Sequence, residues 1–342
     1  MLQPTKPLPV MKIIITGFAG MIGSNLTKAL LEEGHEVLGI DNFWRGSMNN
    51  INLVGISTTD LERLTVVEAD LAAPGPWSDY FKIADIVIHL ADIVAGCSYV
   101  FSNEGSVFRQ NLLINANVAS AVELGKPERY IYVGTACSFP KELQTGVDSK
   151  PLEESDQLPA SPESGYGWSK LMGELDAEYL HRSGATNALT LILHNVYGWP
   201  CKYDDDRAQA IPALCFRAIT SSNGELDVWG DGSQGRAFVH VTDVVRAILL
   251  SIKKDQISGK IQIGPSECTS IRKIANIISD NVSRISKINY LLDKPIGDRG
   301  RSANYARARD LLGWHPTILI ADGIRDLISK ISDDLNTHSQ KA

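Results

Sequence analysis

The stretch KIIITGFAGMIG, residues 12–23, decides the fold because glycines join a β-branched run to a helical pattern. Residues 13–16 predict a buried strand, and the amphipathic pattern of residues 21–33 predicts a helix. Glycines in this context let the backbone turn tightly and approach a phosphate group at the positive end of the helix. We therefore expect a pyrophosphate-binding loop formed by Gly17, Gly20, Met21, Ile22 and Gly23.

Short apolar runs and amphipathic stretches continue to alternate up to residue 135. This alternation predicts right-handed βαβ units on a parallel sheet, and continuous apolar runs suit strands that are covered on both faces. The predicted fold class is α/β, a Rossmann-type doubly wound parallel sheet with a smaller, mixed C-terminal substrate lobe. After the first strand, strands are expected at residues 37–40, 65–68, 85–90, 130–133 and 188–193.

The pattern changes after Trp199 to helices, short strands and loops. We expect residues 11–195 to form the dinucleotide-binding domain and residues 196–335 to form mainly a substrate lobe, with some segments returning to the sheet. Residues 1–10 hold three prolines, and we expect them and residues 336–342 to be tails. Helices are expected at residues 165–181, 208–220, 242–253, 271–280 and 320–331.

The composition excludes several classes of protein. With 44% hydrophobic and 21% charged residues, the 342-residue chain is typical of an ordinary globular protein. A formal net charge of -7 disfavours nucleic acid and anionic membrane as partners, because both require a basic field. The five cysteines are odd in number and lack metal-binding spacing, so we expect reduced thiols and no metal site. No stretch reaches the ~18 apolar residues of a membrane span, and the predicted location is cytoplasmic.

Acidic residues at two strand ends predict the contacts of the cofactor. Asp41 ends the second strand about 20 residues beyond the glycine loop, where a carboxylate accepts hydrogen bonds from an adenosine ribose and repels a 2′-phosphate. NAD is therefore favoured over NADP, although the nearby Arg45 is a counter-signal because arginine can accommodate that phosphate. Asp70 and Leu71 follow the third strand and are placed to meet the adenine, while Asp70 also fits a plain strand-end cap.

Tyr166 and Lys170 are four residues apart, on one face of a predicted helix. We expect the ammonium group, together with the positive charge of the cofactor, to lower the phenol pKa so that Tyr166 acts as an acid or base near neutral pH. Thr135 ends a strand, and its hydroxyl is placed to hydrogen bond the reacting oxygen. The alternative is a surface helix that carries this pair by chance.

These motifs together resemble the extended short-chain dehydrogenase/reductase family, also called the NAD-dependent epimerase/dehydratase family, over about residues 11–331. Within it, the chain resembles the GDP-mannose 3,5-epimerases and, more distantly, the GDP-fucose synthases. The resemblance implies NAD as cofactor, with Leu90 among its contacts, a GDP-sugar as substrate, and a homodimer. It is carried by HLA at 89–91, TACSFP at 135–140, HNVYG at 194–198, VWGDGSQGR at 228–236 and LLGWHP at 311–316.

By this resemblance, Cys137 is an acid/base residue. Oxidation of a ring hydroxyl to a ketone acidifies the neighbouring C–H, and inversion then requires a base on one face and a proton donor on the other. Cys137 would exchange the proton, although an unreactive buried thiol is the alternative. Lys202 is the candidate donor on the opposite face. Its register differs from that of the family lysine, and a solvated loop lysine is equally consistent with the sequence.

Three further residues match positions at which the family contacts its substrate: Asn195, Arg236 and Arg301. The planar guanidinium of arginine binds two phosphate oxygens at once, which suits a nucleotide diphosphate. Surface ion pairing is the alternative for both arginines.

The sequence leaves three hypotheses for function. The first is an NAD-dependent nucleotide-sugar epimerase that oxidises C4 through Tyr166, exchanges a proton at an adjacent carbon through Cys137, and reduces C4 again. The second is an NAD(P)H-dependent reductase of 4-keto nucleotide-sugars, with or without epimerisation. The third is a non-catalytic NAD-binding protein. A dehydratase is less favoured, because that branch of the family places an Asp-Glu pair where this chain has Ala136-Cys137.

Overall fold

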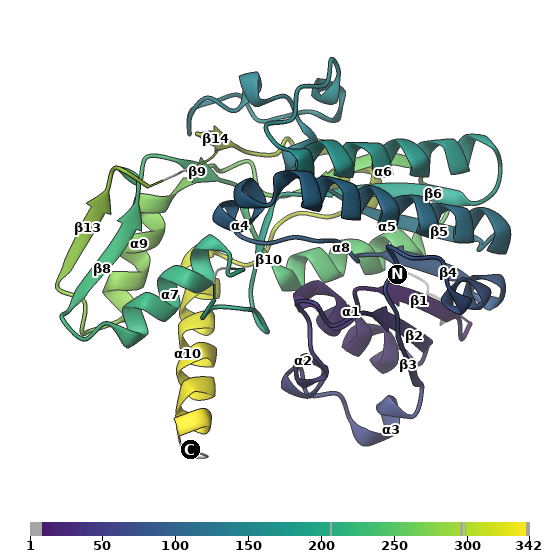
Figure 1. The fold of residues 1–342 in the computed structure, drawn as a ribbon, viewed down its shortest axis with the longest axis horizontal. Coiled ribbons are helices and arrows are strands. Elements are labelled where there is room, and N and C mark those ends of the chain that lie inside the picture. Colours follow the sequence, from purple (N-terminus) through teal and green to yellow (C-terminus); the bar gives the residue numbers. More distant parts are fainter. Residues whose placement is uncertain (1–8, 206, 295–296, 298, 340–342) are drawn as a thin grey trace, which may run out of the picture.

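A parallel sheet organises the fold of the computed structural model, which describes residues 9–205, 207–294, 297 and 299–339 (Figure 1). Within these residues the sheet has seven strands in the order β11-β6-β5-β4-β1-β2-β3, and every neighbouring pair is parallel. The strands are β1 (Lys12–Thr16), β2 (Glu36–Asp41), β3 (Leu64–Glu68), β4 (Ile86–His89), β5 (Arg129–Thr135), β6 (Asn187–Leu193) and β11 (Gly259–Ile263). The predicted doubly wound α/β fold is confirmed.

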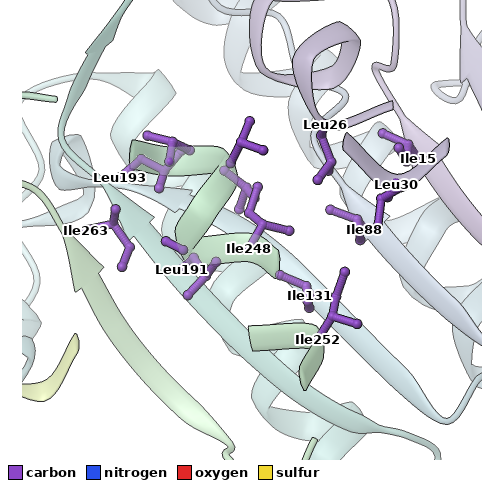
Figure 2. Packing of buried hydrophobic residues seen from close by; sticks show 14 of the residues in the cluster. Ile15, Leu26, Leu30, Ile88, Ile131, Leu191, Leu193, Ile248, Ile252 and Ile263 are labelled. Atoms are coloured by element: carbon purple, nitrogen blue, oxygen red, sulfur yellow. The ribbon is translucent and has the colours of Figure 1, made fainter. Parts of the chain in front are cut away.

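Helices cover both faces of the sheet (Figure 1). On one face, α1 (Met21–Glu32) and α8 (Val241–Lys253) pack on alternate residues of the strands, and Figure 2 shows Leu26 and Ile248 among this cluster. On the other face, α5 (Glu104–Gly125) and α6 (Gly165–Arg182) bury the intervening residues, such as Tyr130. Because both faces are buried, the central strands read as continuous apolar runs, whereas the edge strand β3 is mostly exposed.

The long helix α5 was not anticipated from the sequence. Its buried face includes Asn111 and Asn115, which interrupt the apolar stripe by which a helix is recognised. Both are hydrogen bonded: Asn111 bonds the backbone of Ile93, and Asn115 bonds His89 and the carbonyl of Ser169. Burial of these amides costs little because their partners come from other elements.

The later part of the chain forms a second lobe, which lies to the left in Figure 1. It pairs β8 with β13 in parallel and packs three helices around a second apolar cluster, confirming the helices expected there. Its elements are α7 (Ala210–Thr220), β8 (Glu225–Trp229), α9 (Ile271–Asn281), β13 (Lys287–Leu291) and α10 (Ile320–Ser339). Of the predicted tails, residues 1–8 and 340–342 lie outside the described residues, whereas residues 336–339 continue helix α10 and are not a tail. None of the described helices is long and apolar enough to cross a membrane.

Short elements complete the two lobes. Three small strand pairs connect them: β7 with β10, β9 with β12, and β9 with β14. The short elements are α2 (Met48–Leu53), α3 (Thr58–Leu61), η1 (Pro76–Ile83), α4 (Cys97–Ser102), η2 (Ala136–Ser138), η3 (Lys141–Leu143), η4 (Glu154–Gln157), β7 (Asn195–Tyr197), β9 (Gly235–Arg236), β10 (Phe238–His240), β12 (Thr269–Ser270), β14 (Gly300–Arg301) and η5 (Ala308–Leu312).

The carboxylate of Asp243 ties α8 to the chain segment that leads into α10. Its side chain is almost fully buried and accepts hydrogen bonds from the amide of Thr317 at 2.9 Å and the amide of Ile318 at 3.0 Å. Arg246 and the Thr317 hydroxyl donate to its other oxygen. Burial opposes ionisation, but these hydrogen bonds together lower the pKa of Asp243.

We expect Asp243→Asn to lower the free energy of unfolding at neutral pH by about 2–3 kcal/mol, because the charge that accepts these hydrogen bonds is lost. A carboxylate whose pKa is depressed by folding stabilises the protein above its unfolded pKa of about 4, and this contribution disappears as the pH falls through the folded pKa. The difference between the two proteins should therefore shrink on acidification. Urea unfolding measures it, with exposed Asp280→Asn as control; a difference independent of pH would contradict the assignment.

Candidate active site

The carboxyl ends of the parallel strands open into a cavity of about 1280 Å³ between the sheet and the second lobe. This exceeds the volume of about 300–1,000 Å³ that accommodates one drug-sized ligand, so a dinucleotide and a second ligand both fit. The structure brings every site residue expected from the sequence to this one cavity: Gly17, Gly20, Met21, Ile22, Gly23, Asp41, Asp70, Leu71, Leu90, Thr135, Cys137, Tyr166, Lys170, Asn195, Lys202, Arg236 and Arg301.

The surroundings of a Cβ atom would differ at the three glycines of the loop after β1. Gly17 has a φ of 73°, and a Cβ there would meet the amide nitrogen of Ala91 at 2.8 Å. A Cβ at Gly23 would meet the carbonyl oxygen of Gly17 at 2.3 Å. At Gly20 the nearest atom would be 3.4 Å away, so packing tolerates a side chain at the floor of the cavity. Close backbone packing thus requires glycine at positions 17 and 23. At position 20, the absence of a side chain instead leaves space in the cavity that a Cβ would fill.

Asp41 is held at the end of β2 by two backbone amides, those of Ala19 at 3.1 Å and Phe43 at 2.8 Å. Burial raises the pKa of Asp41, and these hydrogen bonds oppose the rise. Arg45, the counter-signal, donates to the carbonyl of Val94 at 2.9 Å. Burial lowers the pKa of Arg45, and the neighbouring acidic groups Cys201, Tyr166 and Asp205 oppose this fall.

Asp70 caps the end of β3 and lies at the cavity. Its carboxylate accepts a hydrogen bond from the amide of Ala72 at 3.0 Å, as a strand-end cap does, and it also lines the cavity. His89, at the end of β4, is buried and bonds Thr16 at 2.6 Å and Asn115 at 3.1 Å, and burial lowers its pKa to about 3. This histidine is therefore a neutral, structural residue.

Tyr166 lies in the first turn of α6, beside the end of β5. Burial raises its pKa well above the ordinary value, as do the charges of Asp92 and Cys137, while a hydrogen bond to Thr135 and the charge of Arg301 lower it. The predicted lowering of this pKa by Lys170 together with the positive charge of the cofactor stays a prediction for the protein with NAD bound.

The charge of Lys170 is compensated by a buried carboxylate. Its Nζ lies 3.1 Å from Oδ2 of Asp92, and both side chains are 4% exposed. The same Nζ lies 4.8 Å from the ring centroid of Tyr132. Sequence analysis missed Asp92, although a carboxylate just after the apolar strand β4 is the kind of signal that identified Asp41.

Cys137 lies in the short helix η2, directly after β5, and its amide donates to the Thr135 hydroxyl at 3.3 Å. Arg301, which is 5% exposed, donates from Nη2 to Sγ of Cys137 at 3.1 Å and to Oδ1 of Asn195 at 3.4 Å. Its Nη1 donates to Gln144 at 2.9 Å. The guanidinium of Arg301 thus lies against the candidate acid/base thiol, whereas the sequence associates it with the diphosphate.

The remaining expected residues come from the second lobe and its connections. Arg236 on β9 is 8% exposed and donates to the carbonyl of Gly235 at 2.7 Å. Lys202 follows the cis Trp199-Pro200 bond and lines the cavity. Burial opposes ionisation of Asp205, but hydrogen bonds from Arg207 and the charge of Lys202 lower its pKa.

Residues 13–264 match the model of the NAD-dependent epimerase/dehydratase family. The chain belongs to this family. It is 30% identical over 321 residues to GDP-mannose 3,5-epimerase 1 of Oryza sativa subsp. indica, which covers 93% of this chain and 81% of the relative. It is also 25% identical over 312 residues to a dTDP-4-dehydro-6-deoxy-D-allose reductase of Streptomyces bikiniensis, covering 89% of this chain and 91% of the relative.

Solved structures are similar over nearly the whole chain. The UDP-glucuronic acid 4-epimerase of Bacillus cereus, solved with UDP-glucuronic acid and NAD, superposes with a TM-score of 0.80 at 26% identity. The match covers 94% of this chain and 99% of the neighbour. NAD is the cofactor of this epimerase/dehydratase family, and the open cradle at Gly20, the helix N-terminus of α1 and the carboxylate of Asp41 fit such a dinucleotide.

The substitution Gly20→Ala tests cofactor binding separately from the stability of the fold. The added methyl group fits the protein interior but projects into the cavity where the pyrophosphate approaches, so we expect NAD affinity to fall at least about tenfold while thermal stability stays near that of the parent. Isothermal titration with NAD measures the first quantity and calorimetry the second. Gly105→Ala in α5, away from the cavity, is the control. Unchanged NAD affinity in Gly20→Ala would contradict this position for the pyrophosphate.

Proposed function

We propose that the protein is a nucleotide-sugar epimerase that acts on a GDP-sugar by transient oxidation at C4 and proton exchange at a neighbouring carbon. The observation that carries this proposal is the contact of 3.1 Å between Arg301 and Sγ of Cys137, beside Thr135 and within the cavity that Tyr166 lines. A thiol in contact with a buried guanidinium is suited to take up negative charge as it loses a proton. The similarity to GDP-mannose 3,5-epimerases supports the choice of a GDP-sugar.

In the proposed reaction, Tyr166 takes the proton of the C4 hydroxyl while Thr135 orients the hydroxyl oxygen. When bound, NAD supplies the acceptor for the C4 hydride. Cys137 then removes the proton from the carbon next to the ketone, and Lys202 donates a proton on the opposite face. Reduction at C4 completes the cycle, so no external reductant is consumed.

Binding of the substrate is assigned to the second lobe and its connections. Arg236 is the proposed contact to the nucleotide diphosphate, since it is buried, lines the cavity and carries the planar donor group that suits phosphate. Asn195 orients Arg301 and the sugar, because its side-chain oxygen accepts from that arginine at 3.4 Å. Arg301 is proposed to act at the sugar, next to Cys137.

Two further proposals concern the oligomeric state and the cellular compartment of the enzyme. Exposed apolar side chains on α5 and α6 support a homodimer formed through these helices, and they are Leu113, Trp168 and Tyr179, which are 48%, 38% and 59% exposed. The free thiols of Cys137, Cys201, Cys215 and Cys268 support a reducing compartment such as the cytoplasm.

Deuterium uptake tests the proposed reaction. The protein is incubated in heavy water with GDP-, UDP- and dTDP-sugars without added reductant, and the sugar is followed by mass spectrometry and NMR. We expect uptake next to C4 with a GDP-sugar, and a loss of at least about 10²-fold in Cys137→Ala, because the base for that carbon is gone.

Cys268→Ala is the matched control, since this thiol lies near the same arginines, as its pKa shows: burial raises it and the charges of Arg236 and Arg301 lower it. Cys268 is not among the described residues that line the cavity, and its removal should leave uptake unchanged. Absence of uptake with every sugar, together with NADH consumption by 4-keto sugars, would replace the epimerase by a reductase.

A further inference from the structure

The chain segment that leads into the second lobe contacts the cofactor side of the cavity at both of its ends. It consists of residues 199–205 and Arg207, and we call it the bridge segment. Residues 199–205 all line the cavity. At the start of the segment, the carbonyl of Trp199 accepts a hydrogen bond of 2.9 Å from the side chain of Asn25 in helix α1. The bridge segment is therefore attached to the helix that follows the glycine loop.

Arg207 attaches the other end of the bridge segment to the loop after β2. Its Nη1 donates to the carbonyl of Trp44 at 2.7 Å, and its Cζ lies 5.7 Å from the centroid of the Trp44 ring. Its Nε and Nη2 donate to Oδ2 of Asp205 at 2.9 and 2.6 Å. Trp44 also packs against Tyr99 of α4, with 5.6 Å between the ring centroids. One guanidinium thus joins the bridge segment to the nucleotide-binding domain.

The loop that holds Arg207 lies directly on the glycine loop. The amide of Ser47 and the side chain of Asn50 donate to the carbonyl of Ala19 at 3.3 and 2.7 Å. A Cβ at Gly46 would meet the same oxygen at 2.5 Å. These contacts complete a ring that runs from α1 through the bridge segment and the loop after β2 to the glycine loop. Gly20, where the diphosphate of NAD is expected, belongs to this ring.

We propose that the bridge segment closes the cofactor end of the cavity and that Arg207 holds it closed, so that NAD leaves only after Arg207 releases Trp44. The pair of Arg207 and Asp205 is 28% exposed on both sides, and ion pairs of this exposure contribute little to stability. A charged donor to a carbonyl of the other domain is instead suited to hold two loops together. Arg207 is not among the described residues that line the cavity, so we assign it as a positioning residue and not as a contact to NAD.

The contacts of the ring join protein groups to one another. They should therefore slow the entry of NAD as well as its release, as a loop that closes a site does. Slow release suits a reaction in which the same cofactor accepts and returns the hydride. The inference itself concerns only the cofactor of the family and goes beyond the proposed reaction of the sugar.

Exchange of bound NAD tests the bridge segment. The holoenzyme is mixed with an excess of isotopically labelled NAD, and the labelled fraction after rapid desalting gives the release rate by mass spectrometry. Isothermal titration gives the dissociation constant, and the release rate divided by this constant gives the association rate. In Arg207→Gln we expect release to accelerate at least about tenfold, because a charged hydrogen bond that closes the ring is lost. Association should accelerate by a similar factor, so the affinity should change less than about threefold.

A second variant and a control complete the experiment. Asn25→Ala opens the ring at its other end, and we expect it to accelerate both rates in the same way. Arg325→Gln is the control, since Arg325 is an exposed arginine of α10 that pairs with Asp322 at 3.0 Å and is not among the described residues that line the cavity. Its substitution should change neither rate.

Other outcomes overturn the proposal. An unchanged release rate in Arg207→Gln would show that the bridge segment is no barrier. Faster release with unchanged association, and an affinity weakened by the same factor, would make Arg207 a direct contact of NAD. If Arg207→Gln does not fold, Asn25→Ala decides by the same criteria. No step uses a sugar, so failure of the proposed function would leave the test of the bridge segment intact.

Discussion

The close backbone approach between the ends of β1 and β4 is the constraint on which the site depends. A Cβ at Gly17 would lie 2.8 Å from the amide nitrogen of Ala91, so the loop after β1 lies directly against the loop after β4. These strands are neighbours at the point where the strand order reverses, which is where open α/β sheets bind their ligands. The contact places the glycine loop, Asp92 and Thr135 around one cavity.

Paired charges determine the chemistry of that cavity. Asp92 compensates Lys170, and Arg301 lies against Cys137, so Lys170 and Cys137 each have a buried charged partner of their own. Burial and the charge of Asp92 raise the pKa of Tyr166, and Arg301 places positive charge at the thiol. In the proposed reaction, the groups for oxidation and for proton exchange would therefore have separate charged neighbours within a single cavity.

Much of the fold and the outline of the site could be predicted from the sequence. Six of the seven strands and helix α6 have apolar patterns that local geometry explains, whereas β11 was not predicted as a strand. The expected residues at the strand ends reach one cavity because parallel strands end at one edge, and Lys202, Arg236 and Arg301 reach it from the second lobe and its connections. Helix α5 escaped prediction because its buried Asn111 and Asn115 look polar until their partners are known. Asp92 escaped because its ion pair with Lys170 joins two distant segments.

The sequence by itself determined the parallel sheet, the glycine loop and the Tyr166–Lys170 pair, because strand and helix periods and turn-forming glycines are properties of neighbouring residues. Only the tertiary structure placed Asp92 against Lys170 and Arg301 against Cys137. Arg301 and Cys137 are 164 positions apart, and no local pattern encodes their contact. The physical reason is that burial and nearby charges set the pKa of a side chain, and both come from whatever the fold packs around it.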